Sequence, residues 1–101
     1  MVTTPQKVAL QDALKGAEMF KKTLVPLLGF VLNMSSYQCP SCGHSSSLPG
    51  TKTTQDILYA YPNGGGILGT LPFGSEVSET SDQGTPIVIS SPQSYHVRIF
   101  I

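Results

Sequence analysis

The sequence predicts an α/β fold built on parallel strands, and three patterns point to it. An apolar face of helical period precedes an unbroken apolar run at residues 27–32. A second helical pattern precedes a short apolar run at residues 67–71. An apolar run without polar alternation is typical of a strand buried on both faces, as in a parallel sheet covered by helices. The alternating order therefore indicates helices layered on a mainly parallel sheet.

The first predicted helix covers about residues 5–22. Thr4 is a suitable N-cap residue, and Pro5 suits the first helical position because that position needs no N–H donor. Lys21 and Lys22 near the other end match the negative end of the helix dipole. The face expected to pack on the sheet recurs at steps of three or four and consists of Leu10, Leu14, Ala17, Phe20 and Leu24.

The middle of the chain is predicted as strand, long loop and short helix. Pro26 ends the first helix, and residues 27–32 form the first predicted strand. Residues 33–54 are expected to be a loop. Thr54 is a candidate cap for a short helix at about residues 55–61.

The last third of the chain gives weaker signals. The second predicted strand ends at residue 71, residues 75–84 are polar and fit a helical turn, and the apolar run at residues 86–89 has no definite type. Residues 97–101 resemble an element interrupted by the end of the chain. Two or three parallel strands cannot shield one another. We therefore expect the chain to be a truncated part of a larger α/β domain.

The chain is short and poor in charge. It has 101 residues, with six Lys plus Arg against six Asp plus Glu, and 12% of its residues are charged, whereas typical domains have about 25%. Zero net charge argues against a nucleic-acid-binding surface. The sparse charge fits a surface covered by a partner or by further chain, and equally a surface where Ser, Thr and Gln replace charge. The longest apolar stretch, residues 25–34, is too short for a transmembrane segment, which takes about 20 residues.

The only two cysteines, Cys39 and Cys42, lie three positions apart in Cys-Pro-Ser-Cys-Gly-His. Two thiolates at this spacing can bind one soft metal centre, but they fill only half of a four-ligand site. A second copy of the chain or a partner protein would have to supply the other half. From the residues alone a zinc knuckle is favoured, and an iron–sulfur ligand pair and a redox dithiol stay open. His44 is better explained as a neighbour than as a third ligand, and His96 as a surface residue.

A longer set of ordered motifs resembles a known family. The motifs follow one another along nearly the whole chain and include the two cysteines. They resemble the C-terminal half of the Mrp/NBP family of P-loop iron–sulfur cluster carrier ATPases, and most closely its mitochondrial NUBPL branch, which assembles respiratory complex I. The matching segments are Val2 to Gln6, Lys15 to Phe20, Val25 to Gly29, Asn33 to Ser35, Cys39 to His44, Leu68 to Pro72 and Ser81 to Val88.

The resemblance implies a doubly wound sheet and a homodimer or family heterodimer that shares a 4Fe-4S cluster through the cysteine-containing loop, residues 34–54. Cys39 and Cys42 match the family's cluster ligands. Asn33 matches an asparagine that ends a strand near the adenine of ATP, where ligands of open α/β sheets lie. Taken alone, Asn33 is better explained as ending its strand through a bond to the following turn. The implied role is delivery of clusters to apo-proteins such as complex I in the mitochondrial matrix; the chain shows no presequence, and the cytoplasm is the alternative.

The chain also departs from the family pattern. ATP chemistry needs a Gly-rich loop ending in Gly-Lys-Ser/Thr, and neither residues 50–53 nor residues 64–66 match it. Residues 48–66 fit the family poorly, and the segment after Pro92 looks shortened. We therefore expect residues 1–101 to be a partial P-loop NTPase-type domain without the Walker A segment, inactive as an ATPase. The alternative function is a small zinc-binding structural or interaction module that uses the same two cysteines.

Overall fold

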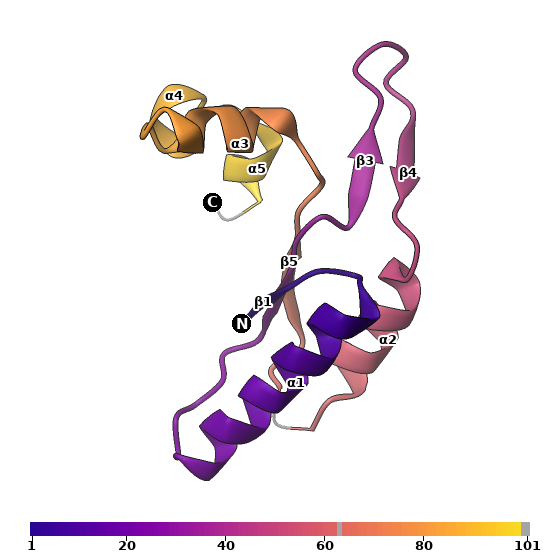
Figure 1. The fold of residues 1–101 in the computed structure, drawn as a ribbon, viewed down its shortest axis with the longest axis vertical. Helices are drawn as coiled ribbons and strands as arrows, with labels where there is room; N and C mark the ends of the chain where they lie inside the picture. Colours follow the sequence, from indigo (N-terminus) through magenta and orange to yellow (C-terminus); the bar gives the residue numbers. More distant parts are fainter. Residues whose placement is uncertain (63, 100–101) are drawn as a thin grey trace.

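A three-stranded parallel sheet forms the centre of the structure (Figure 1). The structure is a computed structural model that describes residues 1–62 and 64–99. The middle strand is β2 (Phe30–Leu32), with β1 (Val2–Thr3) on one side and β5 (Ile67–Thr70) on the other. Both pairs are parallel, so the predicted α/β class with a mainly parallel sheet is confirmed.

The first predicted strand began too early. Only the last three residues of the run at 27–32 pair as β2, because Leu28 is 81% exposed and Gly29 has a φ of 155°. A Cβ at Gly29 would lie 2.8 Å from the Leu68 side chain, so glycine lets β5 approach closely there. Strand β1 was not predicted, since two residues are too few to show an alternating pattern.

Two helices, α1 (Lys7–Lys22) and α2 (Thr51–Ala60), pack on one face of this sheet. Alternate residues of a strand face the same side, and Phe30 and Leu32 are both fully buried, so this is the core side of β2. The buried cluster joins residues from α1, β2 and α2, namely Leu10, Ala17, Phe30 and Leu58.

The opposite face of the sheet is open within the described residues. Val2 of β1 is 66% exposed and Leu68 of β5 is 56% exposed. Parallel sheets normally carry cover on both faces. The described residues thus provide helices for one face only. None of their helices combines the length and apolar character that crossing a membrane requires.

Helix α1 agrees with the predicted residues 5–22 but its ends differ in detail. The N-cap is Gln6 and makes no side-chain cap hydrogen bond, so the prediction of Thr4 as the cap was wrong. At the other end, Val25 N–H donates to the Phe20 carbonyl at 2.9 Å and Leu24 N–H donates to the Lys21 carbonyl at 3.3 Å. These two bonds form a Schellman motif, in which the residue after the cap takes a left-handed conformation.

Leu24 occupies this left-handed position with a φ of 59° and is 89% exposed. It was predicted to lie on the apolar face of the helix, and that prediction was wrong. The Schellman turn points its side chain into solvent instead. Leucine pays a steric penalty in this conformation that glycine avoids.

The predicted loop at residues 33–54 contains regular structure. A hairpin of β3 (Ser36–Gln38) and β4 (Ser45–Ser47) occupies its middle. Helix α2 begins at Thr51, whose hydroxyl donates to the Ser35 and Leu48 carbonyls, each at 2.8 Å. The Thr54 hydroxyl donates to the Pro5 carbonyl at 3.1 Å, so Thr54 links α2 to the start of α1. The prediction that Thr54 caps α2 was wrong, because the N-cap of α2 is Gly50.

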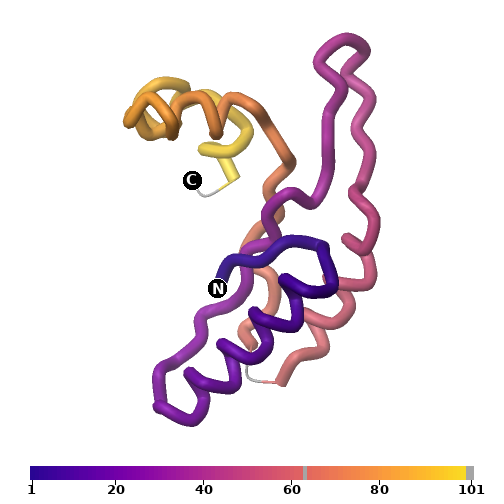
Figure 2. The backbone as a smooth tube through the Cα atoms, in the orientation of Figure 1, coloured from indigo at the N-terminus to yellow at the C-terminus, as the bar shows by residue number. Residues whose placement is uncertain are grey.

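Three short helices follow β5 and form a separate group beyond the end of the sheet (Figure 1). The polar segment predicted as a helical turn is the helix α3 (Ser75–Asp82). The unassigned apolar run is the single turn α4 (Ile87–Ser90), followed by α5 (Tyr95–Arg98). The last two residues of the predicted element at 97–101 lie outside the described residues. Figure 2 shows the hairpin projecting on the other side of this end of the molecule.

Replacing Leu24 by glycine should stabilise the protein by about 0.5–1 kcal/mol, although it removes a leucine. The steric penalty of the left-handed conformation disappears, and an exposed side chain contributes little packing. Urea unfolding followed by circular dichroism measures the change. Leu24→Ala is the matched control, because it removes the same side chain but keeps a Cβ, and it should not stabilise. Equal midpoints for the two variants would contradict this account.

Candidate metal centre

The hairpin that carries both cysteines is anchored to the end of the sheet. Beyond β2 and β5 the two chains continue side by side. Ser35 N–H donates to the Leu71 carbonyl at 2.9 Å, and Phe73 N–H donates to the Ser36 carbonyl at 2.7 Å. Tyr37 then forms an isolated parallel bridge with Phe73. The cysteine turn therefore lies beyond the carboxyl end of the middle strand, where ligands of open α/β sheets bind.

The turn itself is closed by backbone hydrogen bonds. Cys39 N–H donates to the His44 carbonyl at 2.8 Å, and Gly43 N–H donates to the Cys39 carbonyl at 2.9 Å. Gly43 has a φ of 74°, a left-handed conformation that favours glycine. A Cβ at this position would meet no atom within 4 Å, so conformation and not space explains the glycine.

Both cysteines are free thiols and neither lies in the core. Cys39 is half-buried and Cys42 is exposed. The pKa of the Cys39 thiol lies below its ordinary value, because the backbone N–H groups of Cys42 and then Ser41 donate hydrogen bonds to its sulfur. The Cys42 side chain acts in the same direction more weakly, and partial burial opposes it. Hydrogen bonds of this kind favour the thiolate, which is the form that binds metals.

The described residues supply two soft ligands at this turn and no complete set. No group of three or more His, Cys, Asp or Glu side chains within residues 1–62 and 64–99 is arranged to hold a metal ion. The His44 side chain is exposed, while its carbonyl closes the turn. The chemistry of the donors fits one half of a thiolate-ligated centre.

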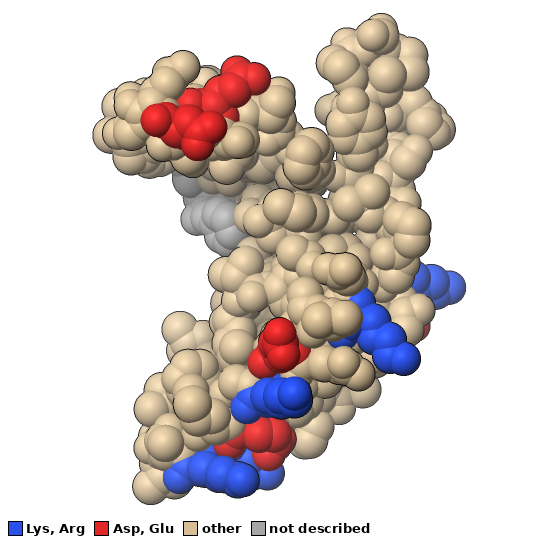
Figure 3. Space-filling view, viewed as in Figure 1, with Lys and Arg blue, Asp and Glu red and all other residues tan. Residues whose placement is uncertain are grey.

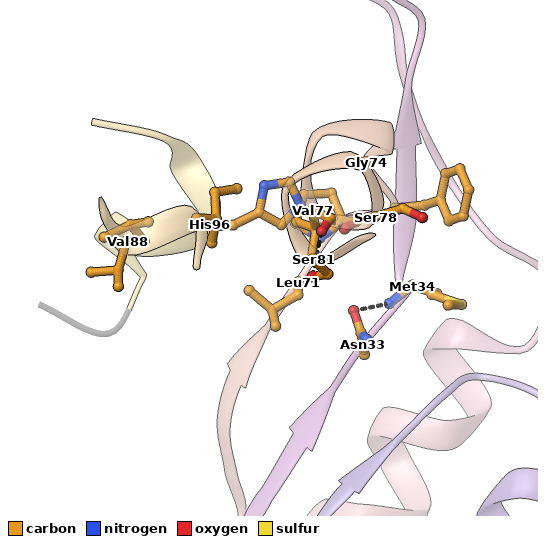
Figure 4. Close-up of a pocket in the computed structure, with 13 residues that line it drawn as sticks. Asn33, Met34, Leu71, Gly74, Val77, Ser78, Ser81, Val88 and His96 are labelled. Atoms are coloured by element: carbon orange, nitrogen blue, oxygen red, sulfur yellow. Dashed lines mark hydrogen bonds between the residues drawn. The ribbon is translucent and has the colours of Figure 1, made fainter. Parts of the chain in front are cut away.

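Asn33 follows directly after β2, and its side chain ends the strand. Its side-chain oxygen accepts the Met34 N–H at 2.9 Å, and Met34 is left-handed with a φ of 54° (Figure 4). This is the strand-ending bond that the sequence suggested when Asn33 was considered alone. The Asn33 amide nitrogen has no hydrogen-bond partner within the part of the chain that the structure describes.

Asn33 also lines a mainly apolar pocket of about 670 Å³ between the end of the sheet and helices α3–α5 (Figure 4). Leu71, Val77 and Val88 contribute apolar surface to this pocket, here called the Asn33 pocket. The far wall of this pocket could not be predicted from the residue pattern, since it depends on how three short helices fold back.

His96 belongs to that wall, and the prediction that it is a surface residue was wrong. The residue is half-buried, and its Nε2–H donates to the Pro72 carbonyl at 3.0 Å. Its Nδ1 lies 3.4 Å from the Ser94 hydroxyl. The sequence could not show this role, because the partner carbonyl lies 24 positions away and backbone carbonyls carry no sequence signature.

A parallel sheet with helices on one face, and with two free cysteines on a turn beyond its middle strand, defines an open α/β protein with a candidate two-thiolate half-site. A family model described as "ParA: NUBPL iron-transfer P-loop NTPase" matches residues 1–101. The chain therefore belongs to the NUBPL group of iron-transfer P-loop NTPases. The family predicted from the ordered motifs, and the NUBPL branch within it, are confirmed.

Individual relatives agree with this family assignment. The chain is 42% identical over 101 residues to a mouse protein named iron-sulfur cluster transfer protein NUBPL, covering all of this chain and 31% of the relative. It is 43% identical over 100 residues to the iron-sulfur cluster carrier protein of Escherichia coli K12, covering 99% of this chain and 27% of that protein. An Arabidopsis thaliana relative named iron-sulfur protein required for NADH dehydrogenase, mitochondrial, is 43% identical over 94 residues, which are 93% of this chain and 29% of the relative. The chain thus spans about 30% of the length of these relatives.

The lowered pKa of Cys39 predicts alkylation at unusually low pH. A thiol with a depressed pKa is ionised at lower pH, and iodoacetamide reacts with the thiolate. In the Cys42→Ala variant, which keeps the two backbone donors, half-maximal alkylation of Cys39 should fall at a lower pH in the folded protein than in urea. Mass spectrometry after timed quenching gives both profiles. Coinciding folded and unfolded profiles would show that the N–H groups do not stabilise the thiolate.

Proposed function

We propose that this chain is an iron–sulfur cluster carrier whose Cys39 and Cys42 hold a 4Fe-4S cluster as cargo. The observation that carries the proposal is the anchored turn, where two accessible thiols lie together and two backbone N–H groups favour the Cys39 thiolate. Family membership over the whole chain supports it. The names of the mouse and bacterial relatives describe cluster transfer and cluster carriage.

The cluster would lie between two subunits. A 4Fe-4S cluster takes four cysteine ligands, and one turn supplies two. A two-fold axis through the cluster brings a second, identical pair to the other side, because each surface then faces its own copy. A homodimer is the simplest assembly that completes the site, and a heterodimer with another family member would do so in the same way. The turn projects from the molecule (Figure 2), which leaves it accessible to a partner.

Apo iron–sulfur proteins are the proposed recipients, and respiratory complex I is the foremost among them. The Arabidopsis relative's name couples an iron–sulfur protein to NADH dehydrogenase and to mitochondria. We therefore propose the mitochondrial matrix as the compartment, with the cytoplasm as the alternative because bacterial relatives are equally similar.

Asn33 is the proposed contact to the adenine base of a nucleotide. Its amide nitrogen is available as a donor, and the Asn33 pocket offers apolar surface for a flat base. The chain's own sequence contains no Gly-Lys-Ser/Thr loop to hold the phosphates. We therefore propose that this chain contacts the base but does not itself hydrolyse ATP. ATP hydrolysis would need the phosphate-binding loop, which we expect in the longer family members.

Anaerobic reconstitution with iron and sulfide tests the cluster. The wild-type chain should turn brown, with broad absorbance near about 400 nm from thiolate-bound iron, and should sediment as two chains per cluster. Cys39→Ala and Cys42→Ala should each lose most of this absorbance, while the matched neighbour variant His44→Ala should keep it. A colourless protein that retains zinc through the same cysteines would overturn the carrier function in favour of the zinc module.

Adenosine binding tests Asn33 without interference from phosphate charge. Asn33→Asp keeps an oxygen for the Met34 N–H but has no amide donor, so the turn survives while the bond to the base is lost. We expect roughly tenfold weaker adenosine binding, because a buried acceptor on the base would lose its partner. Isothermal titration calorimetry measures the dissociation constant. Equal affinity of the two proteins, or no binding by the wild type, would contradict the assignment.

A further inference from the structure

A second hollow lies next to one of the two cysteines. It has a volume of about 860 Å³ and is lined by the hairpin, by the segment after β5 and by α5. We call it the cysteine cleft and define it by Tyr37, Cys39, Phe73, Glu76, Tyr95 and His96. It shares the segment from Pro72 to Gly74 with the Asn33 pocket, so that one stretch of chain forms a wall of both.

The cleft reaches Cys39 and not Cys42. Cys39, Pro40 and Gly43 of the turn line it, whereas Cys42 is exposed outside it. A molecule lying in the cleft would therefore approach only one of the two proposed cluster ligands. A molecule bound in the cleft would therefore reach the proposed cluster at its Cys39 side.

Aromatic side chains line the cleft although they are open to solvent. The Tyr37 and Phe73 rings lie with their centroids 6.2 Å apart, and both are exposed. Tyr95 contributes a third ring and is 61% exposed. Exposed aromatic rings beside a cleft are typical of the centre of a protein–protein interface, where they bury large areas at small entropic cost.

The charge in the cleft is acidic. Among the described residues that line the cleft, Glu76 is the only Asp, Glu, Lys or Arg, and its contact with the Ser94 hydroxyl is long, at 3.5 Å. Helix α3 also carries Glu79 and Asp82 and has no basic residue. Figure 3 shows the acidic side chains of this end separated from the Lys and Arg side chains around α1 and α2. A partner entering the cleft is therefore favoured if it is positively charged.

We propose that the cysteine cleft is the docking groove for an extended basic segment of the recipient apo-protein, a segment that carries a cysteine. This inference rests on the proposed carrier function and adds the place and the chemistry of recipient recognition. The aromatic rings hold the segment, Glu76 attracts its basic side chains, and its cysteine comes to lie beside Cys39. Ligand exchange can then begin there: the bond from iron to the Cys39 sulfur breaks and one to the recipient's sulfur forms. The incoming thiol's proton passes to Cys39, and no electron is transferred.

Binding of a short synthetic peptide tests the groove on the cluster-free chain. The fluorescent peptide carries one cysteine, blocked by methylation, between lysine and arginine residues, and anisotropy gives its dissociation constant. Glu76→Gln should weaken binding about fivefold, as expected for one partly exposed ion pair, and added salt should weaken wild-type binding. Glu76→Lys should instead favour a peptide with glutamates in place of the basic residues. Asp56→Lys on α2, which makes the same charge change outside the cleft, should leave this preference unaltered.

The aromatic wall has an equally matched pair of variants. Tyr95→Ala should weaken peptide binding at least fivefold, whereas Tyr59→Ala, at an α2 position that is 66% exposed, should not. Equal effects of the two, failure of the wild type to bind the peptide, or self-association of the chain lost in Tyr95→Ala would overturn the docking groove. Cluster loading is measured separately on the same proteins by absorbance. Loss of loading with intact peptide binding therefore identifies failure of the carrier function, and intact loading without peptide binding identifies failure of the groove.

Discussion

Backbone pairing beyond the end of the sheet is the constraint on which the rest of the structure depends. Where β2 and β5 end, Leu71 N–H donates to the Leu32 carbonyl and Ser35 N–H donates to the Leu71 carbonyl. The Ser35 hydroxyl adds a third bond, to the same carbonyl, at 3.0 Å. These bonds fix the base of the hairpin, and Thr51 fixes its return to α2 through the Ser35 carbonyl. A turn of six residues can hold two thiols in a defined place only because its base is held in this way.

The predictable part of the fold is the part in which side-chain pattern and burial coincide. The α1 pattern gave its face correctly at Leu10 and Ala17, and the apolar runs located β2 and β5, because these residues pack in the core. The hairpin escaped prediction since Ser45 to Ser47 are all exposed and show no alternation. Leu24 was misplaced because a backbone motif, and not hydrophobicity, decides where its side chain points. The hydrophobic pattern of the sequence therefore predicts which residues pack in the core. It does not predict structure that depends only on backbone hydrogen bonds.

The residues of the candidate site also differ in whether the sequence alone could identify them. Cys39 and Cys42 could be found from spacing, because chelation by two thiolates requires both sulfurs on one short turn. Asn33 could be found only through the resemblance, and the structure shows that its oxygen is already engaged in the strand-ending bond. His96 could not be found at all, since its position depends on Pro72 and on the fold of the final helices. Residues that act through long-range backbone contacts leave no trace in a single sequence.

The wall shared by the Asn33 pocket and the cysteine cleft has a thermodynamic consequence. Pro72, Phe73 and Gly74 border both hollows, and the Phe73 N–H is bonded to the hairpin at Ser36. If the proposed base displaced this shared wall from the side of the Asn33 pocket, the shape of the cysteine cleft would change with it. Because free energies of binding are linked, a peptide would then alter the affinity for the base by the same factor as the base alters the affinity for the peptide. Coupling between the two proposed ligands would then need no domain rotation, because Pro72, Phe73 and Gly74 form the shared wall.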